Sequence, residues 1–109
     1  DEHITTLAEL DTIIAANPKV IVDLTADWCV ECRIMDKNLF HNRPAQMQDW
    51  QLVRLDITET TDDSKAILAR YKLFGPPALL YYQDGQLTNQ QVGEIGRSEF
   101  EQTLTALNQ

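Results

Sequence analysis

The 109 residues of this chain suit one compact domain, and a hydrophobic fraction of 43% is enough for a core around a central sheet. The formal net charge of −8 argues against nucleic acid and anionic membrane surfaces as partners, because both repel an acidic protein. No apolar run approaches the roughly 18 residues needed to cross a bilayer. We therefore expect no direct membrane insertion by this domain, and we expect its partners to be proteins.

The first part of the chain predicts helices and strands in alternation, because helical spacing of apolar residues gives way twice to β-branched or alternating runs. In chain order, the expected elements are a short strand at 2–4, a helix capped by Thr5 or Thr6 and ended by Asn17 and Pro18, a buried strand at Val20–Leu24, a helix from the cysteines to about Asn42, a strand at Leu52–Ile57, and a helix with Ile67, Leu68 and Tyr71 on its apolar face.

The second part predicts a hairpin and a final helix. Asp84 and Gly85 tolerate the positive φ angles of a tight turn between strands at 78–82 and 86–92. Ser98 is the expected cap of the last helix. Parallel βαβ pairing with an antiparallel edge predicts an α/β fold, with a central mixed β-sheet flanked by helices on both faces. The chain, 1–109, forms a single domain in this interpretation.

The only two cysteines of the chain, Cys29 and Cys32, follow a buried strand and open a helix. At a helix start, unpaired N–H groups and the helix dipole stabilise the thiolate of Cys29, whereas Cys32 lies one turn further in and is expected to be more shielded. We interpret Cys29 as the nucleophile that attacks a partner's disulfide and Cys32 as the thiol that resolves the mixed disulfide. This exchange requires no metal or organic cofactor.

Two other interpretations of the cysteine pair, a structural disulfide and a zinc site, have less support. A structural staple closing four residues would constrain the unfolded chain by only about 2 kcal/mol. A zinc site needs about four ligands, and His3 and His41 do not form a ligand pair.

The segments Val22-Asp23-Leu24, Ala26-Asp27-Trp28-Cys29-Val30-Glu31-Cys32 and Gly75-Pro76-Pro77 resemble the thioredoxin superfamily, nearly end to end. Val30-Glu31 between the cysteines, with Arg33 after them, is more similar to the C-terminal periplasmic domain of the thiol:disulfide interchange proteins of the DsbD family than to thioredoxins, which carry Gly-Pro. The resemblance implies the thioredoxin fold.

Two carboxylates are expected to tune the cysteines. Asp23 interrupts an apolar strand and matches the buried acid of thioredoxins, which the resemblance implicates in proton transfer at the resolving cysteine; the alternative is an Asp that reaches solvent at a strand end. Asp36 follows Cys32 by one helical turn and matches an acidic position of the DsbD domain. Both, with Glu31, would disfavour a nearby thiolate and make the domain a reductant. For Glu31 and Asp27, plain surface charge is an equal interpretation.

Four further residues are expected to contact substrate. By resemblance, Pro77 matches a cis-proline beside the disulfide, and Gly93 matches a loop glycine near the same groove. Pro76 has no N–H, so one hydrogen bond often offered to substrate is lost there. Trp28 either covers the disulfide or packs as an ordinary aromatic residue.

The resemblance further implies a monomeric periplasmic domain of a larger inner-membrane protein of a Gram-negative bacterium. Its partners would be the DsbD-type transmembrane domain, which supplies electrons, and the N-terminal periplasmic domain, which receives them, besides other protein disulfides. The alternatives are a free-standing thioredoxin, an oxidant of the DsbA type, which would need a strongly stabilised Cys29 thiolate, and a binding module without redox activity.

Overall fold

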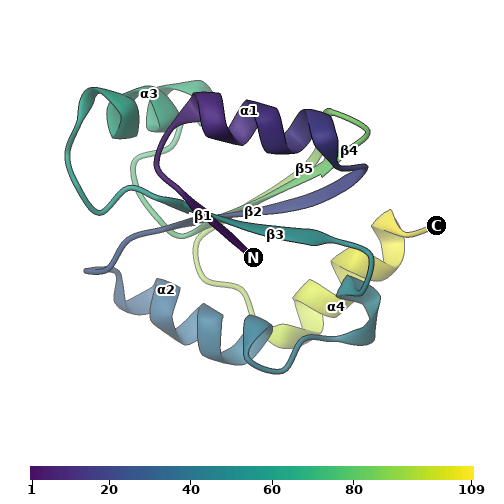
Figure 1. Ribbon diagram of the computed structural model, residues 1–109. Helices are drawn as coiled ribbons and strands as arrows, with labels where there is room; N and C mark the ends of the chain where they lie inside the picture. The colour runs from purple at the N-terminus through teal and green to yellow at the C-terminus, as the bar shows by residue number, and fades with distance from the viewer.

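The computed structural model describes all 109 residues and contains one mixed sheet of five strands, in the order β1-β3-β2-β4-β5 (Figure 1). The strands are β1 (Glu2–Ile4), β2 (Lys19–Thr25), β3 (Gln51–Asp56), β4 (Ala78–Gln83) and β5 (Gln86–Val92). Strand β3 lies parallel to both β1 and β2, whereas β4 lies antiparallel to β2 and to β5. This is the mixed sheet with an antiparallel hairpin edge that the sequence predicts.

Helices cover both faces of the sheet, as expected: α1 and α3 lie above it and α2 and α4 below it in Figure 1. Their bounds are α1 (Leu7–Ala16), α2 (Val30–Met35), α3 (Asp62–Tyr71) and α4 (Arg97–Leu107). Each layer has its own core, because alternate residues of a strand face opposite sides. On β2, Val22 packs with the α1 and α3 side chains, whereas Ile21 packs with those of α4.

The same alternation orients the polar residues of the two central strands. Asp23 shares the face of Ile21, and Arg54 of β3 shares the face of Leu52, so both are directed toward the layer of α2 and α4. In the parallel register, Asp23 pairs with Arg54. A buried acid and a cation are therefore neighbours on the face of the sheet that α2 and α4 cover.

The helix after the cysteines changes its geometry part-way. It is α-helical to Met35 and continues as a π-helical turn over Asp36–Phe40, in which the His41 N–H donates to the Asp36 carbonyl at 3.1 Å. A short 3₁₀ turn follows at Ala45–Met47. Such π-turns often occur at functional sites.

The local signals for turns and caps are mostly confirmed. Thr6 caps α1, and Asp84 and Gly85 have positive φ angles of 51° and 82° in the hairpin. The prediction that Ser98 caps α4 is wrong: the backbone leaves its extended conformation at Gly96, so the helix starts at Arg97 and Ser98 lies in its first turn. None of these helices has the length and apolar character needed to cross a bilayer.

A candidate redox site at the Cys29–Cys32 disulfide

The two cysteines form a disulfide at the start of α2. Strand β2 ends at Thr25, and Cys29 is the N-cap residue of α2, where its Sγ accepts a hydrogen bond from the Cys32 N–H at 3.2 Å. The Cα atoms of the pair are 5.3 Å apart, a separation that suits a disulfide. A disulfide that spans one helical turn at the start of a helix is placed for exchange with a sulfur atom of a partner protein.

Exposure does not distinguish the two cysteines. Cys29 is 5% exposed and Cys32 is 4% exposed, so the oxidised chain shows almost none of the difference in shielding that the sequence predicts. The cause is that the Cys29 side chain turns inward to cap the helix and bond to Cys32. The two cysteines differ in their surroundings, because Cys32 lines a polar cleft and Cys29 does not.

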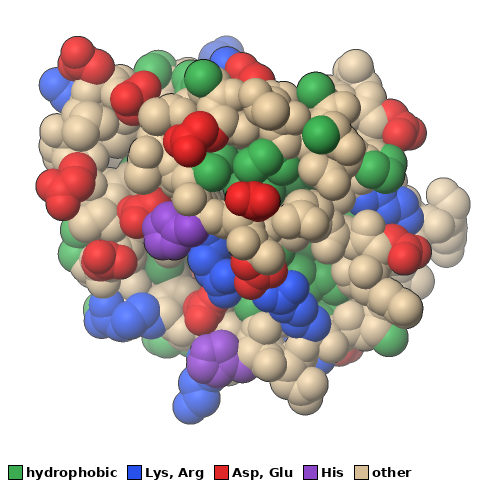
Figure 2. Space-filling model, viewed as in Figure 1, with side chains coloured by type: hydrophobic (Ala, Val, Ile, Leu, Met, Phe, Trp, Pro, Cys, Tyr) green, Lys and Arg blue, Asp and Glu red, His purple; other side chains and the backbone are tan.

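That cleft has a volume of about 480 Å³ and brings together Asp23, Cys32, Asp36 and Arg54. In Figure 2, the face that carries β1, β3 and α2 shows both histidines of the chain, with cationic and acidic side chains interleaved between them. Two of the residues that the sequence singles out as tuning groups therefore share one solvated space with the second cysteine.

Asp23 is the buried acid of this cleft. Only 4% of the residue is exposed, so it does not reach solvent as an Asp at a strand end would. Burial raises the pKa of Asp23 to about 7; Arg54 opposes the shift and Asp36 adds to it. A carboxyl group with a pKa near neutrality can hold or accept a proton at physiological pH.

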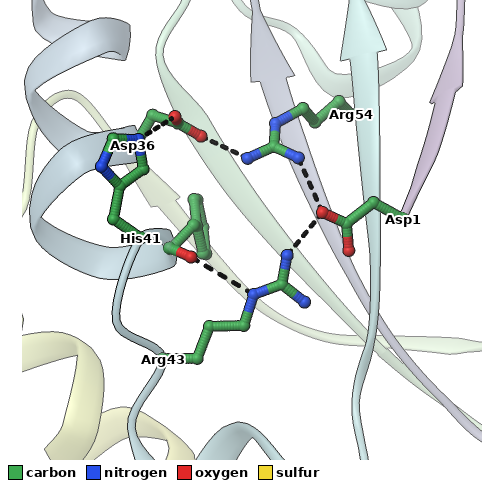
Figure 3. A network of polar contacts seen from close by, with 6 residues as sticks. Asp1, Asp36, His41, Arg43 and Arg54 are labelled. Atoms are coloured by element: carbon green, nitrogen blue, oxygen red, sulfur yellow. Dashed lines mark hydrogen bonds and ion pairs between the residues drawn. The ribbon is translucent and has the colours of Figure 1, made fainter.

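Asp36 has two polar neighbours, Arg54 and His41 (Figure 3). Its carboxylate is ion-paired to Arg54, and His41 Nε2 lies 3.3 Å from its second oxygen. Arg54 also donates to Asp1 at 2.9 Å, and Asp1 is paired to Arg43 at 2.5 Å. Because the Arg54 guanidinium is paired to Asp36, the negative charge of Asp36 acts on the cysteines less than the sequence alone suggests.

Arg54 is a residue of the site that the sequence analysis missed. Arg54 lies on β3, 22 positions after Cys32, and meets Asp23 through strand pairing. A signal was present, since Arg54 is the one cation inside the apolar run of that strand. Aligning the two parallel strands by their apolar faces would have placed it beside Asp23.

Thr58 is the second residue that was missed, and it anchors the loop before Cys29. Its hydroxyl accepts a hydrogen bond from the Asp27 N–H at 2.8 Å and donates to Asp56 at 2.5 Å. Its carbonyl accepts from the Trp28 indole N–H at 3.0 Å. Trp28 is 60% exposed, which excludes the ordinary packing role and leaves its ring at the surface, held by this hydrogen bond.

The other predicted contact residues, Pro76, Pro77 and Gly93, lie together and are called the proline wall below. The Pro76–Pro77 peptide bond is cis, and the Pro77 carbonyl accepts the Gly93 N–H at 2.9 Å. Gly93 has a φ of 90°, a conformation that favours glycine. Ala78, which follows Pro77, pairs with Leu24 near the end of β2, so this wall and the disulfide lie at the same end of the sheet.

The comparison with known proteins agrees with this geometry. The thioredoxin family model matches residues 2–106. A thioredoxin from Mycoplasmoides gallisepticum is 32% identical over 103 residues, which cover 94% of this chain and 98% of that protein.

Proteins of the DsbD type are also similar. The thiol:disulfide interchange protein DsbD of Pseudomonas fluorescens is 38% identical over 101 residues, covering 88% of this chain. The matched part spans only 17% of that longer protein. The oxidised C-terminal domain of DsbD from Neisseria meningitidis superposes with a TM-score of 0.71 at 27% identity, covering 91% of this chain and 90% of that one.

The family match runs almost from end to end, and it includes the disulfide at the helix start and the cis-proline wall that faces the same end of the sheet. This chain therefore belongs to the thioredoxin family and is a thioredoxin-like thiol-disulfide oxidoreductase with a Cys-x-x-Cys centre.

Proposed function

We propose that this chain is an electron-relay domain of the DsbD type, which takes two electrons from a cysteine pair of a membrane domain and passes them to a disulfide of a periplasmic partner domain. The observation that carries the proposal is the placement of Cys32 in one cleft with a buried Asp23 whose pKa is raised to about 7. The identity to DsbD proteins and the Val30-Glu31 pair between the cysteines favour this relay over other members of the family.

The exchange proceeds in two balanced steps. In the reduced chain, the Cys29 thiolate attacks one sulfur of the partner's disulfide, which forms a mixed disulfide and releases the partner's other sulfur as a thiolate that takes up a proton. Cys32 then loses its proton to Asp23, attacks the Cys29 sulfur and frees the second partner sulfur, which takes up the proton. The partner gains two electrons and two protons, and the chain is left with the Cys29–Cys32 disulfide. No metal or organic cofactor enters either step.

Asp23 acts as the proton acceptor because of its environment. An ordinary exposed Asp, with a pKa of 3.8, is a weak base, whereas a carboxylate with a pKa near 7 approaches a thiol's basicity and accepts its proton more readily. Arg54 limits how far burial raises that pKa, because it favours the ionised form of Asp23. In this proposal the domain is monomeric and periplasmic, and belongs to a larger inner-membrane protein.

A free-standing thioredoxin is the second candidate, and the 98% coverage of the Mycoplasmoides gallisepticum thioredoxin favours it. The two candidates differ in their electron donor. We expect the oxidised chain to be reduced by a purified DsbD transmembrane domain and not by thioredoxin reductase with NADPH. Rapid reduction by the reductase, with none by the transmembrane domain, would replace the relay with the thioredoxin.

A further inference from the structure

Arg54 lies beside Asp23 in the sheet but is bound to other carboxylates. The two residues are register partners on β2 and β3, and neighbouring strands lie about 4.8 Å apart, so the Arg54 side chain is long enough to reach the Asp23 carboxyl. Instead, one of its terminal nitrogens donates to Asp1 at 2.9 Å and the other donates to Asp36. No ion pair joins Arg54 to Asp23. Arg54 therefore acts on the buried acid only through its charge.

Asp1 is brought to Arg54 by an edge strand of the sheet. It directly precedes β1, and β1 pairs in parallel with β3, which carries Arg54. The Asp1 carboxylate also accepts from Arg43 at 2.5 Å, so two guanidinium groups share it (Figure 3). The Arg54 guanidinium in turn lies over the Phe40 ring, 5.8 Å from the ring centroid, in a cation–π contact. Three separate contacts, to Asp1, Asp36 and Phe40, thus hold the guanidinium in place.

An ion pair between Arg54 and Asp23 would weaken Asp23 as a base. A cation in contact with a carboxyl group stabilises its ionised form and lowers its pKa by about one to three pH units. In the structure, burial raises the pKa of Asp23 to about 7 while Arg54 opposes the shift without touching the carboxyl. If Arg54 left Asp1 and turned to Asp23, the carboxylate would lose the basicity that proton transfer from Cys32 requires.

The other charged and titratable side chains of the cleft do not replace Arg54. They come from β1, β3, the helix after the cysteines and the loop before them, and are His3, Asp56, Arg33, Asp36, Lys37, His41 and Asp27. Both histidines are paired to carboxylates other than Asp23, at 2.8 Å and 3.3 Å. On the other side of β2, strand β4 places the apolar Leu79 beside Asp23. Only Asp36 acts with Arg54 on the pKa of Asp23, and it raises that pKa. Arg54 is thus the cation whose position matters to Asp23.

We propose that Asp1 is a positioning residue of the exchange: its carboxylate, with that of Asp36, holds the Arg54 guanidinium so that no cation pairs with Asp23. The inference rests on the proposed transfer of a proton from Cys32 to Asp23 and adds a residue to it. Asp1 does not line the cleft that holds Asp23 and Cys32, so it acts on them only through Arg54.

The test removes the Asp1 carboxylate and follows the titration of Asp23. In Asp1→Ala, Arg54 loses one of its two carboxylate partners, so its charge acts more strongly on Asp23. We expect the titration midpoint of Asp23, read from the NMR shift of its isotope-labelled carboxyl carbon in the oxidised chain, to fall by about half a pH unit. Glu2→Ala is the matched control, because Glu2 is the neighbouring exposed acid and does not bind Arg54. Its midpoint should equal that of the wild type.

The exchange itself is followed with dithiobis(nitrobenzoate), a disulfide that releases one coloured thiolate when Cys29 attacks and a second when Cys32 resolves the mixed disulfide. The rise of the second release with pH should move to lower pH in Asp1→Ala, together with the Asp23 midpoint. An unchanged midpoint in Asp1→Ala, an equal fall in Glu2→Ala, or a second release that does not follow the midpoint would overturn the role of Asp1. Absence of the second release in the wild type would overturn the proposed exchange, whatever the midpoint of Asp23.

Discussion

Burial of Asp23 makes the stability of the fold depend on pH in a direction opposite to that of most carboxylates. The pKa of Asp23 rises from an ordinary value of 3.8 to about 7 on folding, because burial disfavours its charged form. Below pH 4 the carboxyl is protonated in both states and costs nothing. Between pH 4 and pH 7 the Asp23 carboxyl is ionised in the unfolded chain but still protonated in the folded chain. The free energy of unfolding therefore falls as the pH rises, and this loss is complete above pH 7.

The size of this loss follows from the shift. A difference of about three pKa units at about 1.4 kcal/mol per unit corresponds to about 4 kcal/mol, a large part of the stability of a small domain. Asp23→Asn removes the titration while keeping nearly the same shape. The variant should therefore gain stability relative to the wild type as the pH rises, by about 4 kcal/mol between pH 4 and pH 8.

Urea unfolding of the oxidised protein at a series of pH values measures this difference directly. The difference between variant and wild type is the relevant quantity, because any constant effect of the amide cancels across the series. Asp49→Asn is the control, since Asp49 is exposed, and its profile should follow that of the wild type. Parallel profiles for Asp23→Asn and wild type would refute the assignment of Asp23 as a buried acid with a raised pKa.

Three other substitutions test the surroundings of the disulfide. Arg54→Met removes the cation that opposes the shift, so the upper end of the pH range over which stability is lost should move above pH 7 in the same urea series, while the lower end stays near pH 4; an unmoved upper end would contradict this role. Thr58→Val breaks the hydroxyl hydrogen bonds that hold the loop before the disulfide and should cost about 1–3 kcal/mol, with a changed Trp28 fluorescence spectrum as the local readout. Gly93→Ala places a side chain at a φ of 90° and should cost about 1 kcal/mol in thermal unfolding; a neutral effect would show that the loop relaxes at no cost.

The sequence was sufficient for the fold and for the position of the disulfide because both depend on local signals. Apolar periodicity, the Asp84-Gly85 turn and two cysteines after a buried strand each predict their structure from neighbouring residues. The cap of α4 was predicted two residues too late, since Gly96 and Ser98 are both acceptable cap residues. The extent of the π-helical turn has no local signal of this kind.

The electrostatics of the site could not be predicted from neighbouring residues. Asp36 was expected to repel the thiolate, but the strand register brings Arg54 to it from the far side of the cleft. Thr58 likewise reaches the loop before Cys29 from the end of β3, 31 positions after Asp27. These contacts join segments that are distant in the chain, so the charge balance around the disulfide is a property of the folded structure.

In the proposed exchange, Cys29 attacks the partner's disulfide and Cys32 then resolves the mixed disulfide. The most direct measurement is mass spectrometry of the covalent adduct that each single-cysteine variant forms with a disulfide-bonded substrate peptide. We expect Cys32→Ala to accumulate a one-to-one mixed disulfide through Cys29, which dithiothreitol releases, and Cys29→Ala to accumulate far less. Equal adducts in the two variants, or a larger adduct through Cys32, would contradict it.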